Sequence, residues 1–280
     1  MAAEVASNKN DAASDVCIEL MTTPQDFAAG YEVLCESFGR QINDAIWTAM
    51  NPGWDTPQGK KEHAARLIER WQSTTTNKAG DPNAVFLKAT LPDPDDSQKR
   101  VVAGMAIWCQ LSFVDGLGDE PKDDPPPFLD DLYPGDAGEP TRRFCAQMIK
   151  SLVRRRIEYV RSLSSSSSSP CSPKDAATFS LDICAVDPRF QRRGVAQRLV
   201  AWGLDEARRR GGLESTTEAS AMGRHAYARL GFRPEAGSGD MVYDVDDEFR
   251  DRPLPPNLFM RTGWSLPSER GEGERGGRGR

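Results

Sequence analysis

The chain has 280 residues, 38% of them hydrophobic and 28% charged, with a formal net charge of −6. A chain of this length can bury a substantial core, and its acidic balance gives no general basic field for nucleic acid, so we expect no nucleic-acid partner. It has no long apolar run and no signal-peptide pattern. These features predict a soluble, cytoplasmic protein that makes no membrane contact.

The cysteines and histidines are scattered and show no metal-ligand spacing. There is no Cys-x-x-Cys pair, and only two histidines are present. We therefore predict no metal site. Four cysteines lie in apolar runs, which favours buried thiols over disulfides. They are Cys17, Cys35, Cys109 and Cys184.

The first part of the chain predicts a strand followed by helices. Residues 1–15 are small and polar, and we expect them to be disordered. A first strand is predicted over residues 16–21, and Thr23-Pro24 is typical of a helix start. Further helices are expected over residues 42–50 and 60–72, where apolar side chains recur at helical spacing.

The middle of the chain alternates between regular and irregular segments. Residues 84–90 and 101–111 read as two strands joined by an acidic turn. Residues 115–140 are acidic and rich in proline and glycine, so no regular element is expected there. A basic helix is predicted over residues 141–163, followed by a Ser-rich linker over residues 164–173.

The most informative stretch is residues 179–212, which reads as strand, turn and helix. In the predicted strand, regular alternation places Phe179, Leu181, Ile183 and Ala185 on one face, and Ser180, Asp182, Cys184 and Val186 on the other. An amphipathic helix is expected from Gly194 to the Gly211-Gly212 pair. Beyond it we expect a strand over 213–220, a helix over 223–230, closing strands over 241–245 and 258–261, and a disordered Gly/Arg tail over 265–280.

The turn between strand and helix predicts an anion site. Gly194 and Ala196 are small enough to let a ligand approach the backbone. The free N–H groups of the first helical turn suit a phosphate or diphosphate, and Arg192 and Arg193 add full charges. Neither a P-loop nor a dinucleotide fingerprint is present.

Two motifs resemble the GCN5-related N-acetyltransferase (GNAT) family. They are Val186-x-Pro188-x-x-Gln191-x-x-Gly194-x-Ala196 and Ala226-Tyr227-Ala228-Arg229-Leu230-Gly231-Phe232. The resemblance implies a mixed α/β fold with a central, mostly antiparallel sheet, two splayed parallel strands and flanking helices. It implies a domain over 16–264 that transfers an acetyl group from acetyl-CoA to a primary amine of a small molecule, by direct attack in a ternary complex.

The resemblance also assigns residues to roles. The acyl-CoA contacts fall on Cys184, Ala185, Val186, Gln191, Arg192, Arg193, Gly194, Val195, Ala196, Gln197 and Ser220. Tyr227 is the candidate general acid that protonates the departing sulfur, and the Val186 N–H is the candidate oxyanion donor. Asp182 and Glu218 compete as general base, with a water relay that uses neither as the third possibility. His225 is expected to face away from the site.

Several alternatives stay open at this point. The acceptor could instead be a protein N-terminus or lysine, or the chain could be a non-catalytic acyl-CoA-binding module. Phe38, Trp47 and Trp54 either line the acceptor side or belong to the core. The run 154–156 is either a contact to the 3′-phosphate of coenzyme A or to an acidic partner, or a solvated helix face. The carboxylates of 115–140 either attract a cationic acceptor or are merely solvated. Nothing in the sequence specifies an oligomeric state.

Overall fold

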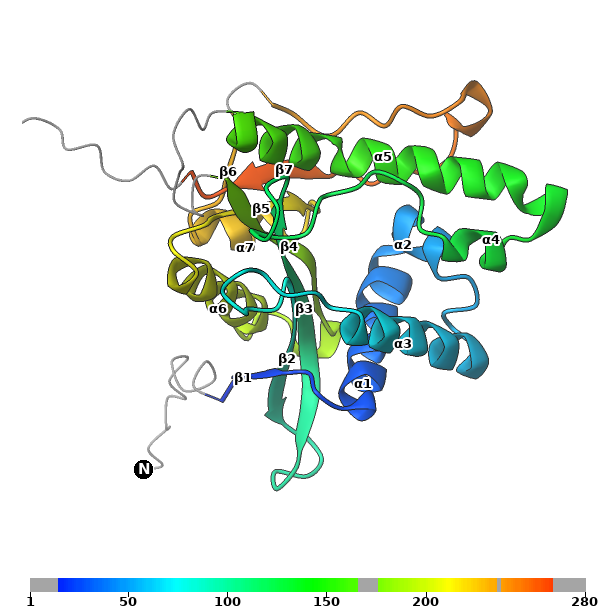
Figure 1. Ribbon diagram of the computed structural model, residues 1–280. Helices are drawn as coiled ribbons and strands as arrows, with labels where there is room; N and C mark the ends of the chain where they lie inside the picture. The colour runs from blue at the N-terminus through cyan, green and yellow to red at the C-terminus, as the bar shows by residue number, and fades with distance from the viewer. Residues whose placement is uncertain (1–14, 166–175, 236–237, 264–280) are drawn as a thin grey trace, which may run out of the picture.

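The computed structural model describes residues 15–165, 176–235 and 238–263. Seven strands form one sheet in the order β1-β2-β3-β4-β5-β7-β6, with helices on both faces (Figure 1). The two ends and most of the Ser-rich linker, for which disorder or a linker is predicted, lie outside the described residues.

The helices and strands follow one another along the chain in a simple order. They are β1 (Cys17–Leu20), α1 (Pro24–Leu34), the π-helix η1 (Cys35–Ile42), α2 (Ala45–Met50), α3 (Pro57–Gln72), β2 (Ala84–Pro92), β3 (Arg100–Ser112), α4 (Phe128–Leu132), α5 (Gly135–Ser165), β4 (Ala177–Val186), the 3-10 turn η3 (Pro188–Phe190), α6 (Val195–Arg209), β5 (Glu214–Ala219), α7 (Arg224–Arg229), β6 (Arg233–Pro234), the 3-10 turn η4 (Asp247–Phe249) and β7 (Leu258–Arg261).

The sheet is antiparallel except between β4 and β5, which run parallel. Their pairing stops at Leu181 and Thr217. Beyond this point β4 continues along β3 only, while β5 continues along β7. The predicted mixed sheet with two splayed parallel strands is therefore confirmed, and the split leaves one edge of the last residues of β4 open.

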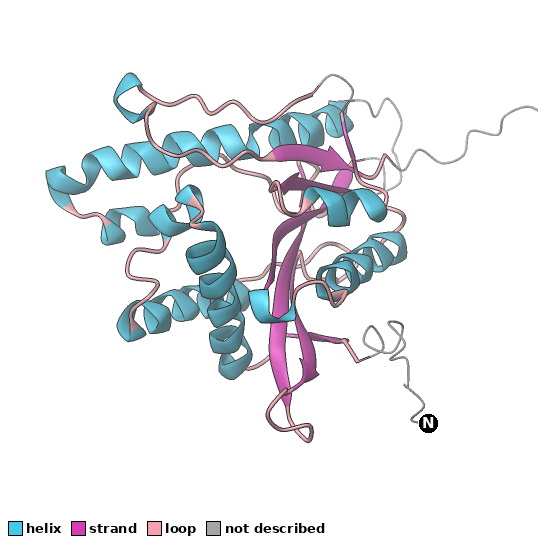
Figure 2. Cartoon of the chain, turned by 180° about the vertical axis from the view of Figure 1, so that it is seen from behind, coloured by secondary structure: helices cyan, strands magenta, loops and turns pink. Residues whose placement is uncertain are grey.

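Helices cover both faces of the sheet. Helices α1 and α3 pack on one face and α6 and α7 on the other, while α5 runs across one end (Figures 1 and 2). Each face has its own apolar cluster. Trp108 is fully buried in the cluster under α6, with its ring stacked on Phe179 at 5.2 Å, so core packing is its role.

Helix starts follow the local sequence chemistry. Thr23 caps α1, its hydroxyl accepting from the Asp26 N–H while the Asp26 carboxylate accepts from the Thr23 N–H. Asp44 caps α2 by accepting from the Trp47 N–H. The segment between these helices was not predicted: residues 35–42 form a π-helix, a rare element that is frequent at functional sites.

Because of a β-bulge, the side chains of β4 do not lie on the faces that the sequence predicted. Ile183 pairs with Ile107 and Leu181 pairs with Trp108, so Asp182 is one extra residue in β4. A single extra residue turns every later side chain to the opposite face. Cys184 and Val186 therefore join Phe179 and Leu181 in the cluster under α6, and Ile183 and Ala185 join the cluster under α1. The predicted common face for Asp182 and Cys184 is wrong.

Three further predictions are wrong. Residues 115–140 contain α4 and the start of α5, because Pro140 is accommodated near the beginning of the helix. Residues 241–245 form no strand, and the side chains of Met241, Tyr243 and Val245 pack beside Phe144 and Met148 of α5 instead. Cys17 is exposed. Every helix in the described part of the chain is too short or too polar to span a lipid bilayer.

Candidate active site

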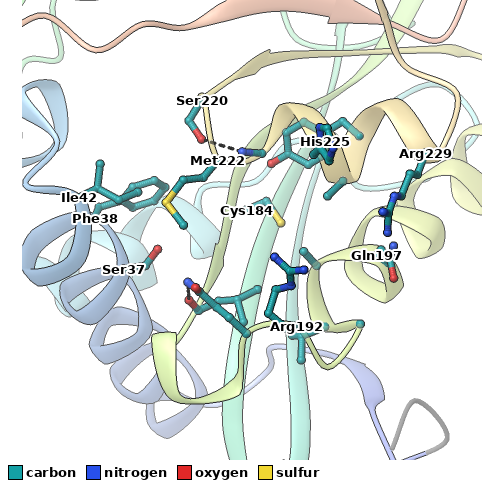
Figure 3. A pocket seen from close by; sticks show the side chains of 18 residues that line it. Ser37, Phe38, Ile42, Cys184, Arg192, Gln197, Ser220, Met222, His225 and Arg229 are labelled. Carbon is teal, nitrogen blue, oxygen red and sulfur yellow. Dashed lines mark hydrogen bonds between the residues drawn. The ribbon is translucent and has the colours of Figure 1, made fainter. Parts of the chain in front are cut away.

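A cavity of about 570 Å³ opens where β4 and β5 separate. It is bounded by η1, the end of β4, the first turn of α6, and the segment from the end of β5 through α7 (Figure 3). Its lining comprises Ser37, Phe38, Ile42, Cys184, Val186, Gln191, Arg192, Gly194, Val195, Ala196, Gln197, Ser220, Met222, Gly223, His225, Ala226, Tyr227 and Arg229.

The turn before α6 presents backbone donors to this cavity. Arg192 and Gly194 both adopt left-handed backbone, with φ of 64° and 82°, and Gly194 precedes the first residue of the helix. A left-handed conformation is strained for most residues but open to glycine. The N–H groups of Val195, Ala196 and Gln197 belong to the first helical turn and have no acceptor within the helix. This cradle fits a diphosphate.

The open edge of β4 offers a second set of backbone groups. Asp187 donates its N–H to the Ala103 carbonyl at 3.0 Å, which fixes the alternation of the ladder with β3. Val186, one residue earlier, therefore directs its own N–H and carbonyl away from β3 toward the gap. Its carbonyl accepts from the Gln191 amide at 3.1 Å.

Most of the predicted cofactor residues meet at this cavity. Those that line it are Cys184, Val186, Gln191, Arg192, Gly194, Val195, Ala196, Gln197 and Ser220. Two do not. Ala185 is buried in the cluster under α1, and the Arg193 guanidinium lies over the Phe190 ring, 5.9 Å from its centroid. The Ser220 hydroxyl accepts from the Gly223 N–H at 3.2 Å, which stabilises the turn into α7.

Tyr227 and Cys184 lie together on the cavity wall, from α7 and β4 respectively. The Tyr227 ring lies against the backbone of Gly223, where a Cβ would clash with it. Burial, helped by the neighbouring Cys184, raises the pKa of Tyr227 well above its usual value. Burial also raises the pKa of the Cys184 thiol to about 12, against a smaller opposing effect of the Tyr227 hydroxyl. Both groups are therefore protonated and uncharged at neutral pH.

Asp182 and Glu218 lie outside the lining of the cavity, in an ion-pair network that is buried at Arg156 and Glu218 and exposed at Arg70. Arg156 of α5 bonds both carboxylates: its guanidinium is 3.1 Å from Asp182 Oδ1 and 3.0 Å from Glu218 Oε1, with a second contact to Glu218 Oε2. Arg70 of α3 holds the other Asp182 oxygen at 2.8 Å. The Glu218 side chain is only 4% exposed.

This network bonds the oxygens of both carboxylates and lowers the pKa of Asp182. Burial alone would raise the pKa of Asp182, but Arg70 and Arg156 together outweigh it and hold that pKa below its usual range. Burial likewise opposes the charge of Arg156, yet Glu218 and Asp182 raise the pKa of the guanidinium. A carboxylate whose proton affinity is lowered, and whose oxygens are already bonded, is a poor proton acceptor.

Several residues of the site were not found from the sequence. Arg156 is buried, so a solvated helix face is wrong for it. It continues the row of Met148 and Leu152 at helical spacing of four, which is the signal that places it inward. His225 lines the cavity, contrary to the prediction that it faces away. Arg70, Ile42, Met222 and Arg229 carried no sequence signal.

The aromatic alternatives divide between cavity and core. Phe38 lines the cavity, whereas Trp47 and Trp54 pack behind it against the cluster under α1. The Phe38 and Trp47 ring centroids are 6.2 Å apart. On the same turn of η1, Gln41 pairs with Gln191 through two amide hydrogen bonds of 2.7 and 3.1 Å, which tie this helix to the turn before α6.

Within the residues that the structure describes, no three His, Cys, Asp or Glu side chains gather in a way that would hold a metal ion.

A search of curated proteins found no match to this sequence. The model of the acetyltransferase (GNAT) family matches residues 167–232, which include the turn before α6 and Tyr227.

Solved structures with a similar fold extend over most of the chain. Arylalkylamine N-acetyltransferase 2 from Aedes aegypti has a TM-score of 0.50 and 16% identity, covering 88% of this chain and 98% of that one. A histone acetyltransferase HPA2 and related acetyltransferase from Corynebacterium glutamicum has a TM-score of 0.48 and 18% identity, covering 91% and 99%. The ribosomal-protein-S18-alanine N-acetyltransferase from Escherichia coli has a TM-score of 0.42 and 14% identity, covering 91% and 97%.

The matched region and the geometry thus agree, since the family match covers the parallel pair β4 and β5, the left-handed turn and the tyrosine of α7. Over residues 167–232 the chain therefore matches the acetyltransferase (GNAT) family.

Proposed function

We propose that the protein is an N-acetyltransferase that moves an acetyl group from acetyl-CoA to the primary amine of a small molecule. The observation that carries the proposal is one continuous cavity joining three parts: the anion cradle at the start of α6, the open edge of β4, and the paired Cys184 and Tyr227. These parts match the diphosphate, the pantetheine arm and the thioester of acetyl-CoA in order.

The cradle would hold the cofactor largely through backbone groups. The N–H groups of Val195, Ala196 and Gln197 would bond the diphosphate, and Arg192 adds charge to them. The open edge at Cys184 and Val186 would extend the sheet by bonding the pantetheine amides. Because the Val186 N–H is directed into the gap, we assign it as the donor to the thioester oxygen.

Acetyl-CoA supplies an acetyl group already activated as a thioester. The amine nitrogen bonds to the carbonyl carbon, the carbon–sulfur bond breaks, and the proton lost by nitrogen passes to water. Tyr227 would donate its hydroxyl proton to the departing sulfur and recover one from solvent. Its raised pKa means that the hydroxyl still carries this proton at neutral pH.

Direct attack is favoured over an acyl-enzyme. Cys184 is the thiol on the cavity wall, and with a pKa raised to about 12 it is almost entirely protonated at neutral pH, whereas nucleophilic attack needs the thiolate. We also propose water, rather than Asp182 or Glu218, as the proton acceptor, because both carboxylates lie outside the lining and are held by Arg156.

Two other functions remain as alternatives. Protein acetylation would need a groove for a peptide beside η1 and α2, and a fold alone does not decide the acceptor. A module that only binds acyl-CoA would show the same cradle without turnover. Release of free thiol from acetyl-CoA in the presence of an amine separates this module from an enzyme.

The experiment measures acetyl-CoA binding by thermal unfolding and turnover by thiol release. A large excess of acetyl-CoA over its Kd should stabilise the wild type by about 3 kcal/mol. Ala196→Glu places a carboxylate against the diphosphate, at a cost of several kcal/mol, or roughly a 100-fold loss of affinity. Ala196→Gly is the matched control and should keep binding. Wild-type protein that acetyl-CoA does not stabilise, or Ala196→Glu that binds normally, would refute the proposal.

A further inference from the structure

The cavity has two chemically different ends. Basic and polar side chains gather at one, and Figure 3 shows Arg192, Gln197 and Arg229 on that side of Cys184. On the other side of Cys184 the figure shows the large apolar side chains of Phe38, Ile42 and Met222, together with the small hydroxyl side chains of Ser37 and Ser220. The basic end serves the diphosphate, which leaves the apolar end for the second substrate.

The apolar end is built from two separate segments. Phe38 and Ile42 are four residues apart on η1, so they share one face of that helix, and Phe38 is supported from behind by the Trp47 ring. Met222 comes from the turn between β5 and α7 and is 53% exposed, which is unusual for so large an apolar side chain. An exposed methionine facing a supported aromatic ring is an adaptable contact for an apolar ligand.

Charge gives the second line of argument. Of the residues that line the cavity in the described part of the chain, none is an aspartate or a glutamate. The two nearby carboxylates, Asp182 and Glu218, are already bonded to Arg156. An acceptor that carries several positive charges would therefore find no counter-ion in the lining, while Arg192 and Arg229 would repel it.

We infer that the acceptor is a primary amine attached to an alkyl or aryl group, which packs between Phe38, Ile42 and Met222 while the nitrogen faces the thioester beside Cys184. This inference rests on the proposed acetyl transfer. It also explains how the amine becomes reactive, because an apolar site without carboxylates favours the neutral form of an amine that is charged in water.

The test compares kcat/KM for three acceptors with acetyl-CoA saturating. Hexylamine and ethylamine have the same amine but different apolar length, and spermidine has several charges. Hexylamine should exceed both of the others by at least about tenfold, since apolar pockets discriminate to this extent. A kcat/KM for ethylamine or spermidine that equals or exceeds that for hexylamine overturns the inference, as does turnover of none of the three.

A variant then locates the site. Met222→Glu should lower kcat/KM for hexylamine at least about tenfold, with acetyl-CoA affinity unchanged. The ratio of kcat/KM for hexylamine to kcat/KM for spermidine should also fall. Val242→Glu is the matched control, because Val242 is 75% exposed and lies outside the lining. Equal effects of both variants, or no effect of Met222→Glu, overturn the assignment. If the wild type does not bind acetyl-CoA, the proposed function itself is refuted instead.

Discussion

The two faces of β4 beside the bulge carry titratable side chains in different charge states. On the cavity face, Cys184 and Tyr227 are titratable but uncharged. On the opposite face, Asp182 lies in a network of four charged groups with Arg70, Arg156 and Glu218. A single extra residue, Asp182 itself, separates these environments.

This difference indicates a division of labour. The uncharged face can donate a proton to a leaving group without placing a permanent charge beside the thioester. The charged face contributes to the stability of the point where β4 and β5 part, because Arg156 joins the first residues beyond the last paired ones, Asp182 and Glu218. Substitutions on the cavity face should therefore change turnover, and substitutions on the opposite face should change stability.

The largest effect is expected from Tyr227→Phe. Removing the hydroxyl removes the proposed proton donor, so kcat should fall by about 100-fold to 10,000-fold, the usual contribution of general acid catalysis. The Kd for acetyl-CoA and the midpoint of thermal unfolding should change little. Steady-state kinetics and titration calorimetry provide these values. Unaltered kcat with an unaltered pH profile would remove Tyr227 from the acid role.

The next effect is on the opposite face, from Arg156→Met. It leaves the buried Glu218 without its cation and the partly exposed Asp182 with Arg70 alone, which should lower the free energy of unfolding by about 3 kcal/mol in urea titrations. The double variant with Glu218→Gln is the control, and it should recover part of the loss because one buried charge is gone. A stable single variant with impaired catalysis would reverse the proposed division of labour.

The smallest effect is a pH dependence that belongs to Asp182. Its pKa is lowered in the folded protein, so its contribution to stability is complete above the unfolded pKa of about 4 and is lost as the pH falls through the folded value. Asp182→Asn should therefore cost about 1–3 kcal/mol at pH 7 and progressively less below pH 4. Asp131→Asn, at an exposed position, is the control. A loss that stays constant between pH 7 and 3 would contradict this.

The sequence was sufficient where local chemistry decides the structure. Gly194 and Ala196 predicted a turn open to a ligand, and both residues line the cavity; the tyrosine before Gly231-Phe232 likewise lies on one of its walls. The mixed sheet with its parallel pair followed from the resemblance and is confirmed. Such features depend on few residues close together in the chain.

The remaining features depend on contacts between distant segments. The bulge at Asp182 breaks no sequence rule, yet it overturned the predicted faces of the strand. Glu218 and Asp182 are on different strands, and their partner Arg156 is on a helix that precedes both, so no local pattern predicted the network. Residues 241–245 alternate like a strand, but α5 rather than the sheet covers the side chains of Met241, Tyr243 and Val245.

The position of Arg156 has a consequence for any attempt to shorten the protein. The segment between β3 and β4 resembles an accessory insertion, yet its long helix supplies the counter-ion for two strands that come after it in the chain. A trimmed version that joins β3 directly to β4 would leave Glu218 without its cation and Asp182 with Arg70 alone where the sheet divides. Neutral replacements for Asp182 and Glu218 would have to accompany the deletion.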